Sequence, residues 1–251
     1  MDKYAVYSGS RNLYPDMVTA AKSLIANSSV DKVYFLIEDP DFPRELEIPR
    51  DIIEPMDISK QKFFEEKTCK NWKTTYTFMS LMRVCYTKLF PDISKILQLD
   101  VDTVVVDNID WLWDGLDISK KYFAANNEHE GKWKPYGPIY PNIGVAMFNL
   151  DLIRKDGLDE ELIFFLNNTK VPYIDQDAWA RFGMHKFQDL PRCYNECYMV
   201  GFTPNPKIIH FAGIKNWQHG FKTPRVEYLQ KYRDMTWDEV MDIHESINHK
   251  R

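Results

Sequence analysis

The sequence predicts an α/β fold in which a sheet is flanked by helices on both sides. Short apolar runs with strand character alternate along the chain with segments of helical periodicity, as they do in α/β folds. Residues 33–37 form a continuous run of this kind, which is typical of a strand buried on both faces of a parallel sheet. Polar clusters follow several of the predicted strands, at the edge where such sheets bind ligands.

The first predicted elements are a strand at residues 4–7, a helix that begins near Pro15 and the strand at residues 33–37. Proline is favoured at the first position of a helix, because its missing N–H needs no partner there. The apolar residues of this helix share one face, and they are Met17, Ala20, Ala21, Leu24 and Ile25. A second helix, which ends before Pro91, is predicted from the spacing of Phe78, Leu81, Met82, Cys85, Tyr86 and Leu89.

The remaining predicted strands lie at residues 95–106, 122–125, 143–148 and 208–211, and residues 225–251 predict one or two helices. No repeat, low-complexity tract or Gly/Ser linker marks a domain boundary. We therefore expect one domain at residues 1–220 and a C-terminal helical extension at residues 221–251 that packs on it.

The composition excludes several classes of protein. The 251 residues are 44% hydrophobic and 27% charged, and the formal net charge of -5 gives no basic field for nucleic acid or anionic lipid. No apolar run approaches the length of a membrane span, and the start of the chain is unlike a signal peptide. The four cysteines lack zinc-site spacing, so we expect free thiols in a cytoplasmic protein. Peripheral contact with a membrane stays open.

Asp100 and Asp102 are separated by one residue within a stretch of strand character. If that stretch continues as one strand, both carboxylates share a face, because successive side chains alternate. Like charges this close are costly without a cation, so the pair indicates a divalent metal site. A solvated turn after a core strand would also explain two aspartates, but Leu99 and Val101 flank Asp100 with apolar groups.

Four further polar clusters follow along the chain, and each has an ordinary structural explanation when it is considered alone. Asp175 or Asp177 would cap a helix, and His210 would be a hydrogen-bonded core histidine. The clusters are Asn142 with Gly144, Asp175-Gln176-Asp177, Leu190-Pro191 with Tyr194-Asn195, and His210 with Gly213, Lys215 and Trp217.

Together and in this order, the clusters resemble the family-8 glycosyltransferases, which are retaining enzymes of the GT-A fold. That group includes glycogenin and bacterial lipopolysaccharide galactosyl- and glucosyltransferases. The resemblance runs from about Tyr4 to Trp217 and includes a helix that carries Arg83. It implies a GT-A fold, with a single Rossmann-like mixed sheet flanked by helices. It also implies a metal-dependent hexosyltransferase that moves galactose or glucose from a UDP-sugar to a saccharide acceptor such as a cell-surface glycan.

The resemblance implies that Asp100, Asp102 and His210 hold a divalent ion, Mn²⁺ or Mg²⁺. Carboxylates with one imidazole suit Mn²⁺, and the open positions of the ion would bind the diphosphate of the UDP-sugar. The ion would then neutralise charge on the departing UDP as a Lewis acid.

The resemblance also implies a donor-binding site. The ring of Tyr14 is expected to stack on uracil, and Arg83 is expected to reach the donor sugar and its phosphates. One residue fewer than usual separates Gly213 from Lys215, which leaves the diphosphate contact of Lys215 open. The full expected set is Ser8, Ser10, Asn12, Tyr14, Arg83, Asp102, Asn142, Gly213 and Lys215.

Asp175-Gln176-Asp177 matches the catalytic segment of the family, in which the glutamine faces the anomeric carbon. An amide oxygen is a poor nucleophile, so we favour same-face substitution through an oxocarbenium-like transition state that Gln176 stabilises. Covalent catalysis by Asp175 or Asp177 stays open, because a carboxylate can act as the nucleophile.

Three alternative functions remain. A glycogenin-like, self-glucosylating initiator would need an acceptor tyrosine near the site, for which Tyr136 and Tyr140 are the candidates in an aromatic segment at residues 126–141. The same segment is also our candidate for an acceptor-site loop. A non-catalytic nucleotide-sugar binding protein would not need a competent residue at every chemical position. A metal-dependent nucleotidyltransferase would explain the aspartates but not Gln176 or His210.

Overall fold

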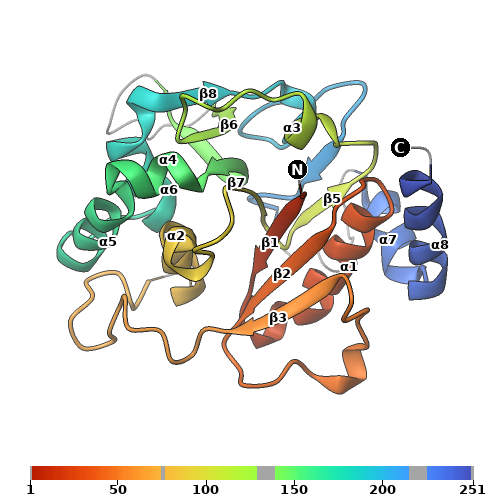
Figure 1. The fold of residues 1–251 in the computed structure, drawn as a ribbon, viewed down its shortest axis with the longest axis horizontal. Helices are drawn as coiled ribbons and strands as arrows, with labels where there is room; N and C mark the ends of the chain where they lie inside the picture. The colour runs from red at the N-terminus through yellow and green to blue at the C-terminus, as the bar shows by residue number, and fades with distance from the viewer. Residues whose placement is uncertain (1, 75–76, 129–138, 215–224, 250–251) are drawn as a thin grey trace.

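The computed structural model describes residues 2–74, 77–128, 139–214 and 225–249. Two sheets form its centre (Figure 1). The large sheet contains β1 (Tyr4–Ser8), β2 (Lys32–Ile37), β3 (Ile53–Asp57), β4 (Lys95–Leu99), β6 (Phe123–Asn127), β7 (Pro141–Asn149) and β8 (Phe187–Asp189). The small sheet pairs β5 (Thr103–Val105) with β9 (Ile208–His210).

The strand order of the large sheet is β3-β2-β1-β4-β7-β6-β8. Strands β1 to β4 are parallel, whereas β7 runs antiparallel to both of its neighbours, β4 and β6. The start of β7 therefore lies beside the carboxyl end of β4. This arrangement confirms the mixed sheet predicted from the sequence, and it brings the polar start of β7 to the ligand-binding edge.

Helices cover both faces of the large sheet. The α-helices are α1 (Tyr14–Ile25), α2 (Tyr86–Leu89), α3 (Trp111–Asp114), α4 (Leu150–Asp156), α5 (Leu158–Asn168), α6 (Ile174–Phe182), α7 (Val226–Asp234) and α8 (Trp237–Asn248). Short 3₁₀ helices are η1 (Arg11–Leu13), η2 (Arg44–Leu46), η3 (Phe78–Val84), η4 (Met184–Lys186) and η5 (Arg192–Tyr194).

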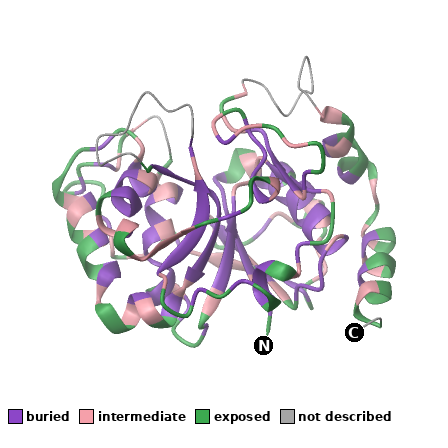
Figure 2. Ribbon diagram, turned by 90° about the horizontal axis from the view of Figure 1, so that it is seen from above, coloured by how far each residue is buried: buried purple, intermediate pink, exposed green. Residues whose placement is uncertain are grey.

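The central strands β1, β4, β6 and β7 are buried on both faces, and Figure 2 shows the sheet between two groups of helices. Side chains of β1 alternate between two cores. Ala5 and Tyr7 pack with α1, whereas Val6 packs with the core of α4, α5 and α6. This double burial explains why the parallel strands read as continuous apolar runs.

The predicted second helix is wrong in its detail. The segment forms the 3₁₀ helix η3, and the short helix α2 begins only after Cys85. Phe78, Leu81 and Val84 recur every third residue, which fits the three residues per turn of a 3₁₀ helix as well as an α-helix. Apolar spacing alone could not separate the two.

The C-terminal helices α7 and α8 lie against α1, at the right of Figure 1. Asn27 donates a hydrogen bond of 2.6 Å to the hydroxyl of Tyr232, and Lys22 donates one of 2.5 Å to the carbonyl of Met235. The ring of His244 lies 3.1 Å from the carbonyl of Ile25. The predicted helices are therefore confirmed, while the division into a domain and an extension stays a prediction.

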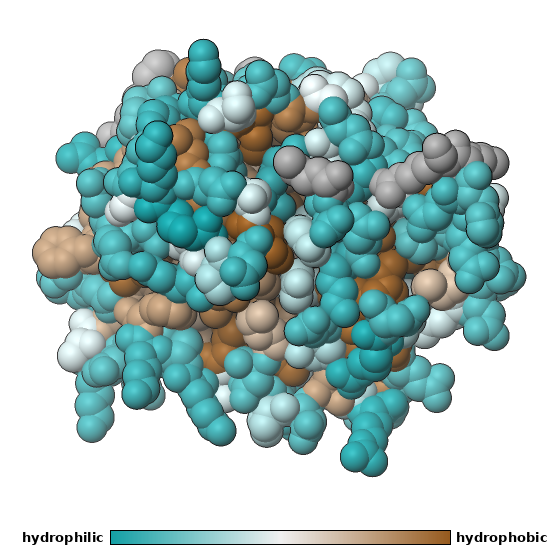
Figure 3. All heavy atoms as spheres, in the orientation of Figure 1, coloured by the Kyte–Doolittle hydropathy of each residue, from teal (hydrophilic) through white to brown (hydrophobic). Residues whose placement is uncertain are grey.

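The surface in Figure 3 is mostly hydrophilic, with apolar side chains scattered in small areas. Within the described parts of the chain, every helix falls short of the length and apolar character that a membrane span requires. All four cysteines are free thiols, as the sequence predicts.

A capping box begins α8. The Thr236 hydroxyl accepts from the backbone N–H of Glu239, and the Glu239 carboxylate accepts from the backbone N–H of Thr236. We expect Thr236→Ala to lower the free energy of unfolding by about 1 kcal/mol, because it leaves an N–H at the helix start without a partner. Denaturant titration measures this change. Thr236→Ser keeps the hydroxyl and should stay near wild type; equal losses in both variants would contradict a capping role.

Candidate active site

An acidic turn lies between the large and the small sheet. Asp100 follows β4 and Asp102 precedes β5, so the two carboxylates do not belong to one continuous strand as predicted. The turn is closed by a hydrogen bond of 3.1 Å from the N–H of Thr103 to the carbonyl of Asp100. The N–H of Asp100 donates to the carbonyl of Gly144 at 2.8 Å, which ties the turn to β7. The chain therefore bends at the acids, where it passes from one sheet to the other.

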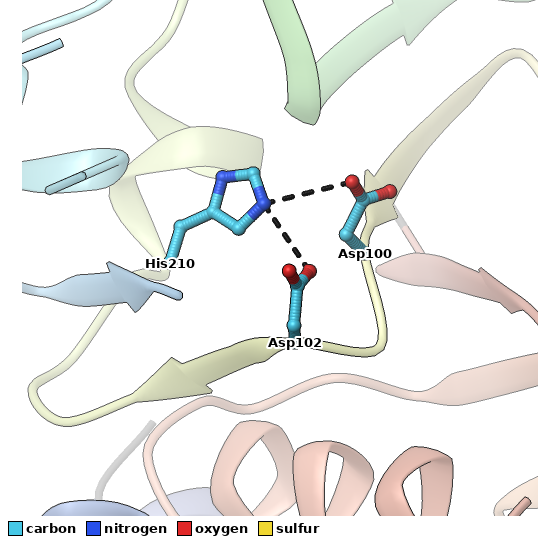
Figure 4. Close-up of side chains that lie close together, drawn as sticks. All are labelled: Asp100, Asp102 and His210. Carbon is cyan, nitrogen blue, oxygen red and sulfur yellow. Dashed lines mark ion pairs between the residues drawn. The ribbon is translucent and has the colours of Figure 1, made fainter. Parts of the chain in front are cut away.

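His210 ends β9 and completes a group of three candidate metal ligands. It is paired with Thr103 across the small sheet, and the next residue, Phe211, donates its N–H to the carbonyl of Asp102 at 2.9 Å. Figure 4 shows the imidazole directed toward both aspartates, with Nε2 at 3.6 Å from Asp100 Oδ2 and 3.2 Å from Asp102 Oδ1. One ligand atom from each residue lies within 4.8 Å of the others.

This donor set fits a divalent cation, because two carboxylates and one imidazole suit ions such as Mn²⁺. Burial would lower the pKa of His210, but the charge of Asp102 and hydrogen bonds to both aspartates raise it well above its ordinary value. Without a metal ion, Nε2 therefore carries a proton that faces the carboxylates of Asp100 and Asp102. A cation bound at Nε2 would take the place of that proton.

Gly144 in β7 makes room for the imidazole. A Cβ atom at this position would lie 2.1 Å from Cε1 of His210, far inside van der Waals contact. The sheet can therefore approach the histidine only with a glycine here. A second glycine, Gly213, has a φ of 75°, a conformation that side chains with a Cβ rarely adopt.

Arg83, near the end of η3, connects three parts of the site. Its guanidinium lies 2.6 Å from Asp100 and 3.3 Å from Asp175, and its Nε donates to Ser8 Oγ at 3.4 Å. Burial would lower the pKa of Arg83, but the two carboxylates raise it. Burial would raise the pKa of Asp100, but Arg83 and His210 hold it at about 2. Arg83 thus stabilises the charged form of the acidic turn.

Helix α6 begins at the site with an unfavourable backbone conformation. Ile174 has a φ of 25°, which is rare for a β-branched residue and must be imposed by the surrounding structure. Asp175 and Gln176 follow in the first turn. Burial raises the pKa of Asp175 to about 6, although Arg83 opposes this increase and Asp100 adds to it.

A cavity of about 420 Å³ brings these groups together. Candidate residues that line it are Arg83, Asp100, Asp102, Asn142, Asp175, Gln176, His210 and Gly213. A cavity of about 490 Å³ at the opposite edge of the sheet is lined by Lys95 and Asn149 and contains none of the three candidate metal ligands. The chemistry predicted from the sequence is therefore concentrated in the smaller cavity.

The structure corrects the expected position of Asp177. This residue is fully buried and does not line the cavity. The hydroxyl of Tyr140 donates to its Oδ1 at 2.8 Å, and the N–H of Tyr173 donates to its Oδ2 at 2.9 Å. Both oxygens have partners, so Asp177 supports the start of α6 and is not placed to attack a donor sugar.

The structure also corrects the expected role of Tyr14. Its side chain is fully buried, its ring packs on Phe42 at 5.2 Å, and its hydroxyl donates to Asp39 at 2.9 Å. No face of the ring is free to stack on uracil. The neighbouring hydroxyl of Ser10 bonds Asn12 at 2.8 Å, and neither residue lines the cavity.

Two polar residues of the site were not predicted from the sequence. Glu128 follows β6, is 7% exposed, and accepts hydrogen bonds from Asn142 and Gln176 at 2.9 and 3.0 Å. Asn195, noted only as part of a turn, is fully buried and lies 2.9 Å from Nδ1 of His210. Lone Glu and Asn residues carry no spacing signal. Lys215, Trp217 and Tyr136 lie outside the described residues.

Comparisons with known proteins match most of this chain. A family model described as Glycosyl transferase family 8 matches residues 5–220. Glycosyltransferase GlyD of Streptococcus pneumoniae is 24% identical over 272 residues, which cover 97% of this chain and 32% of GlyD.

Two solved structures are similar over nearly the whole chain. Glycosyltransferase GlyE of Streptococcus pneumoniae TIGR4 has a TM-score of 0.76 at 20% identity, covering 98% of this chain and 64% of that one. The galactosyltransferase LgtC, in complex with donor and acceptor sugar analogues, has a TM-score of 0.71 at 17% identity, covering 96% and 99%. These likenesses confirm the GT-A fold. The chain spans only part of the length of both pneumococcal proteins.

The contact between Gly144 and His210 can be tested by substitution. We expect Gly144→Ala to cost about 1–3 kcal/mol of stability, because the added methyl group displaces the imidazole. Thermal unfolding in the absence of metal would be measured for Gly144→Ala, His210→Ala and the double variant. Removal of the imidazole makes space, so the double variant should recover most of the loss. Simple addition of the two single effects would show that the residues do not meet.

Proposed function

This chain belongs to glycosyl transferase family 8, and on that premise we propose that it transfers galactose or glucose from a UDP-sugar to a saccharide acceptor, with retention of the anomeric configuration. One observation carries the proposal. The candidate metal ligands, Arg83 and Gln176 line one cavity of about 420 Å³ at the carboxyl end of β4. That cavity offers groups for a diphosphate and for a sugar side by side.

The residues around the acidic turn suit a nucleoside diphosphate. Asp100, Asp102 and His210 would hold Mn²⁺ or Mg²⁺, which supplies positive charge to the diphosphate as it leaves. Arg83 already faces Asp100 and the cavity, so its guanidinium would contribute a second cation. Gly213 allows the backbone to come close to the phosphates.

Gln176 is the group we assign to the reaction centre. It lines the cavity in the first turn of α6, where its amide would stabilise positive charge on the anomeric carbon in an oxocarbenium-like transition state. Asp175 is paired with Arg83 and Asp177 is enclosed, which favours same-face substitution over a covalent step through either carboxylate. The acceptor proton would pass to a phosphate oxygen of UDP.

The self-glucosylating alternative finds less support. Tyr140, one of its two candidate acceptors, is 2% exposed and its hydroxyl is engaged with Asp177. A buried phenol that donates to a carboxylate is poorly placed to receive a sugar. We therefore propose a saccharide acceptor. Separately, we propose a cytoplasmic location.

Metal and nucleotide should bind together. UDP alone should raise the melting temperature weakly, and UDP with Mn²⁺ should raise it clearly, because the cation links the carboxylates to the diphosphate. Asp100→Asn, Asp102→Asn and His210→Ala should each remove the metal-dependent part. Differential scanning fluorimetry measures the shift.

The control for this experiment is Asp92→Asn, which removes an exposed carboxylate near Ser94 and Lys95, at the far edge of the sheet. It should show the full shift with UDP and Mn²⁺. A full shift in all three site variants would refute the metal site, and no shift in the unsubstituted protein would argue against a UDP-dependent enzyme.

Gln176→Ala should keep UDP and Mn²⁺ binding but lower the turnover of the UDP-sugar by roughly 10- to 1,000-fold, as expected for one electrostatic contact to the transition state. Hydrolysis of UDP-galactose and UDP-glucose without acceptor provides the assay, and Gln230→Ala on α7 is the control. NMR of the released sugar, recorded before mutarotation, shows the anomer formed. An inverted product, or equal loss of UDP affinity and turnover, would contradict the proposed mechanism.

A further inference from the structure

A continuous chain of side-chain hydrogen bonds runs from the candidate metal centre to Gln176. His210 Nδ1 lies 2.9 Å from Asn195 Oδ1, and Asn195 Nδ2 donates to Asn142 Oδ1 at 2.9 Å. Asn142 Nδ2 donates to Glu128 Oε1 at 2.9 Å, and Gln176 Nε2 donates to the same oxygen at 3.0 Å. The residues of this path come from separate segments of the chain: His210 ends β9, Asn195 follows η5, Asn142 lies in β7, Glu128 follows β6 and Gln176 lies in α6.

The direction of the bonds in this chain follows from Glu128 and from the N–H of Gly144. The Glu128 oxygen Oε1 accepts both hydrogen bonds, so Asn142 and Gln176 both present an NH₂ group to it. The oxygen of Asn142 then faces Asn195 and also accepts from the N–H of Gly144 at 3.1 Å. Because Asn142 has partners on both sides, its amide cannot turn without breaking bonds inside the protein.

At one end of the chain, this direction determines the state of His210. Asn195 donates through Nδ2 to Asn142, so it offers its oxygen to Nδ1 of the imidazole. Nδ1 must then carry a hydrogen, which leaves the lone pair of Nε2 for a cation between Asp100 and Asp102. Glu128 and the N–H of Gly144, which both orient Asn142, thus favour the tautomer that the metal centre needs.

At the other end, the direction determines which atom Gln176 offers to the cavity. Its NH₂ group is held by Glu128, so the amide oxygen is the end left for a ligand. An oxygen with partial negative charge stabilises a developing carbocation, whereas an NH₂ group in its place would repel it. The orientation of the amide therefore decides whether Gln176 helps or hinders the reaction.

We propose that Glu128 is a positioning residue that orients Gln176 for glycosyl transfer and, together with the N–H of Gly144, orients the amides of Asn142 and Asn195 that hold His210. This inference rests on the proposed function. Glu128 is buried and its Oε1 already has two N–H partners, so its part is to hold the chain and not to attack the sugar.

Glu128→Met tests the proposal with little change in volume. The thioether offers no oxygen, so Asn142 and Gln176 both lose their acceptor. Asn142 is still held by Gly144 and Asn195, whereas Gln176 becomes free to turn its NH₂ group to the cavity. We expect hydrolysis of UDP-galactose or UDP-glucose to fall by about 10- to 100-fold, the range for residues that orient a functional group. UDP affinity with Mn²⁺ should change little, because the N–H of Gly144 still orients Asn142.

Glu128→Gln is the conservative control. Both neighbours bond the same atom, Oε1, so an amide oxygen in that position keeps both contacts and turnover should stay close to wild type.

A spectroscopic readout keeps the test independent of turnover. In ¹⁵N-labelled protein without metal, the side-chain NH₂ signals of Gln176 would be assigned by their loss in Gln176→Glu. Glu128→Met should shift the signals of Gln176 and Asn142 strongly, because both lose their acceptor. Glu161→Met, at an exposed residue on α5, is the matched control and should leave both unchanged.

A paired substitution separates positioning from general damage. Gln176→Glu sets two carboxylates against each other and should lower the melting temperature. Adding Glu128→Gln should restore most of the loss, because one of the two carboxylates is then a neutral amide. Wild-type turnover with unshifted NH₂ signals in Glu128→Met would overturn the inference. If the unsubstituted protein neither binds UDP nor cleaves a UDP-sugar, the proposed function fails, whereas the NH₂ signals still decide whether Glu128 holds Gln176.

Discussion

The crowding of carboxylates in one cavity is the constraint on which this structure depends. Asp100, Asp102 and Asp175 line the same cavity, where their negative charges repel one another unless a cation lies nearby. The guanidinium of Arg83 offsets the charges of Asp100 and Asp175, and protonated His210 offsets those of Asp100 and Asp102. A divalent ion would relieve the remaining repulsion. η3 and β9 place these two cations beside the acidic turn.

Much of the fold was predictable because it follows from local patterns. Continuous apolar runs identified the buried strands, and the order of the polar clusters located the site along the chain. The errors arose where a pattern has two structural solutions. Asp100 and Asp102 converge through a turn and not through the pleat of a strand, and η3 shares its apolar spacing with an α-helix. For an aromatic residue at a helix start, such as Tyr14, the sequence pattern is the same whether the ring faces a ligand or the core.

The contacts between clusters were not predictable, because they depend on the register of distant segments. Glu128 reaches Asn142 because residues 126 and 127 pair with the start of β7 after an irregularity in β6. Asn195 reaches His210 because the next residue, Glu196, donates its N–H to the carbonyl of Ile208 and accepts from the N–H of His210. Neither contact can be inferred from the spacing of residues along the chain. Such partners become visible only when the sheet has been assembled.

The candidate metal ligands come from two segments that are far apart in the sequence, and this has a consequence for how the protein folds. Closing the long loop between Asp102 and His210 costs chain entropy, which is recovered only after β5 has paired with β9. The unfolded chain therefore has no preformed site, and a bound ion contributes its free energy to the native state alone. The ion would not guide early folding. It would instead slow the opening of the small sheet, and amide hydrogen exchange in β5 and β9 would become the slow, ligand-dependent part of the exchange profile.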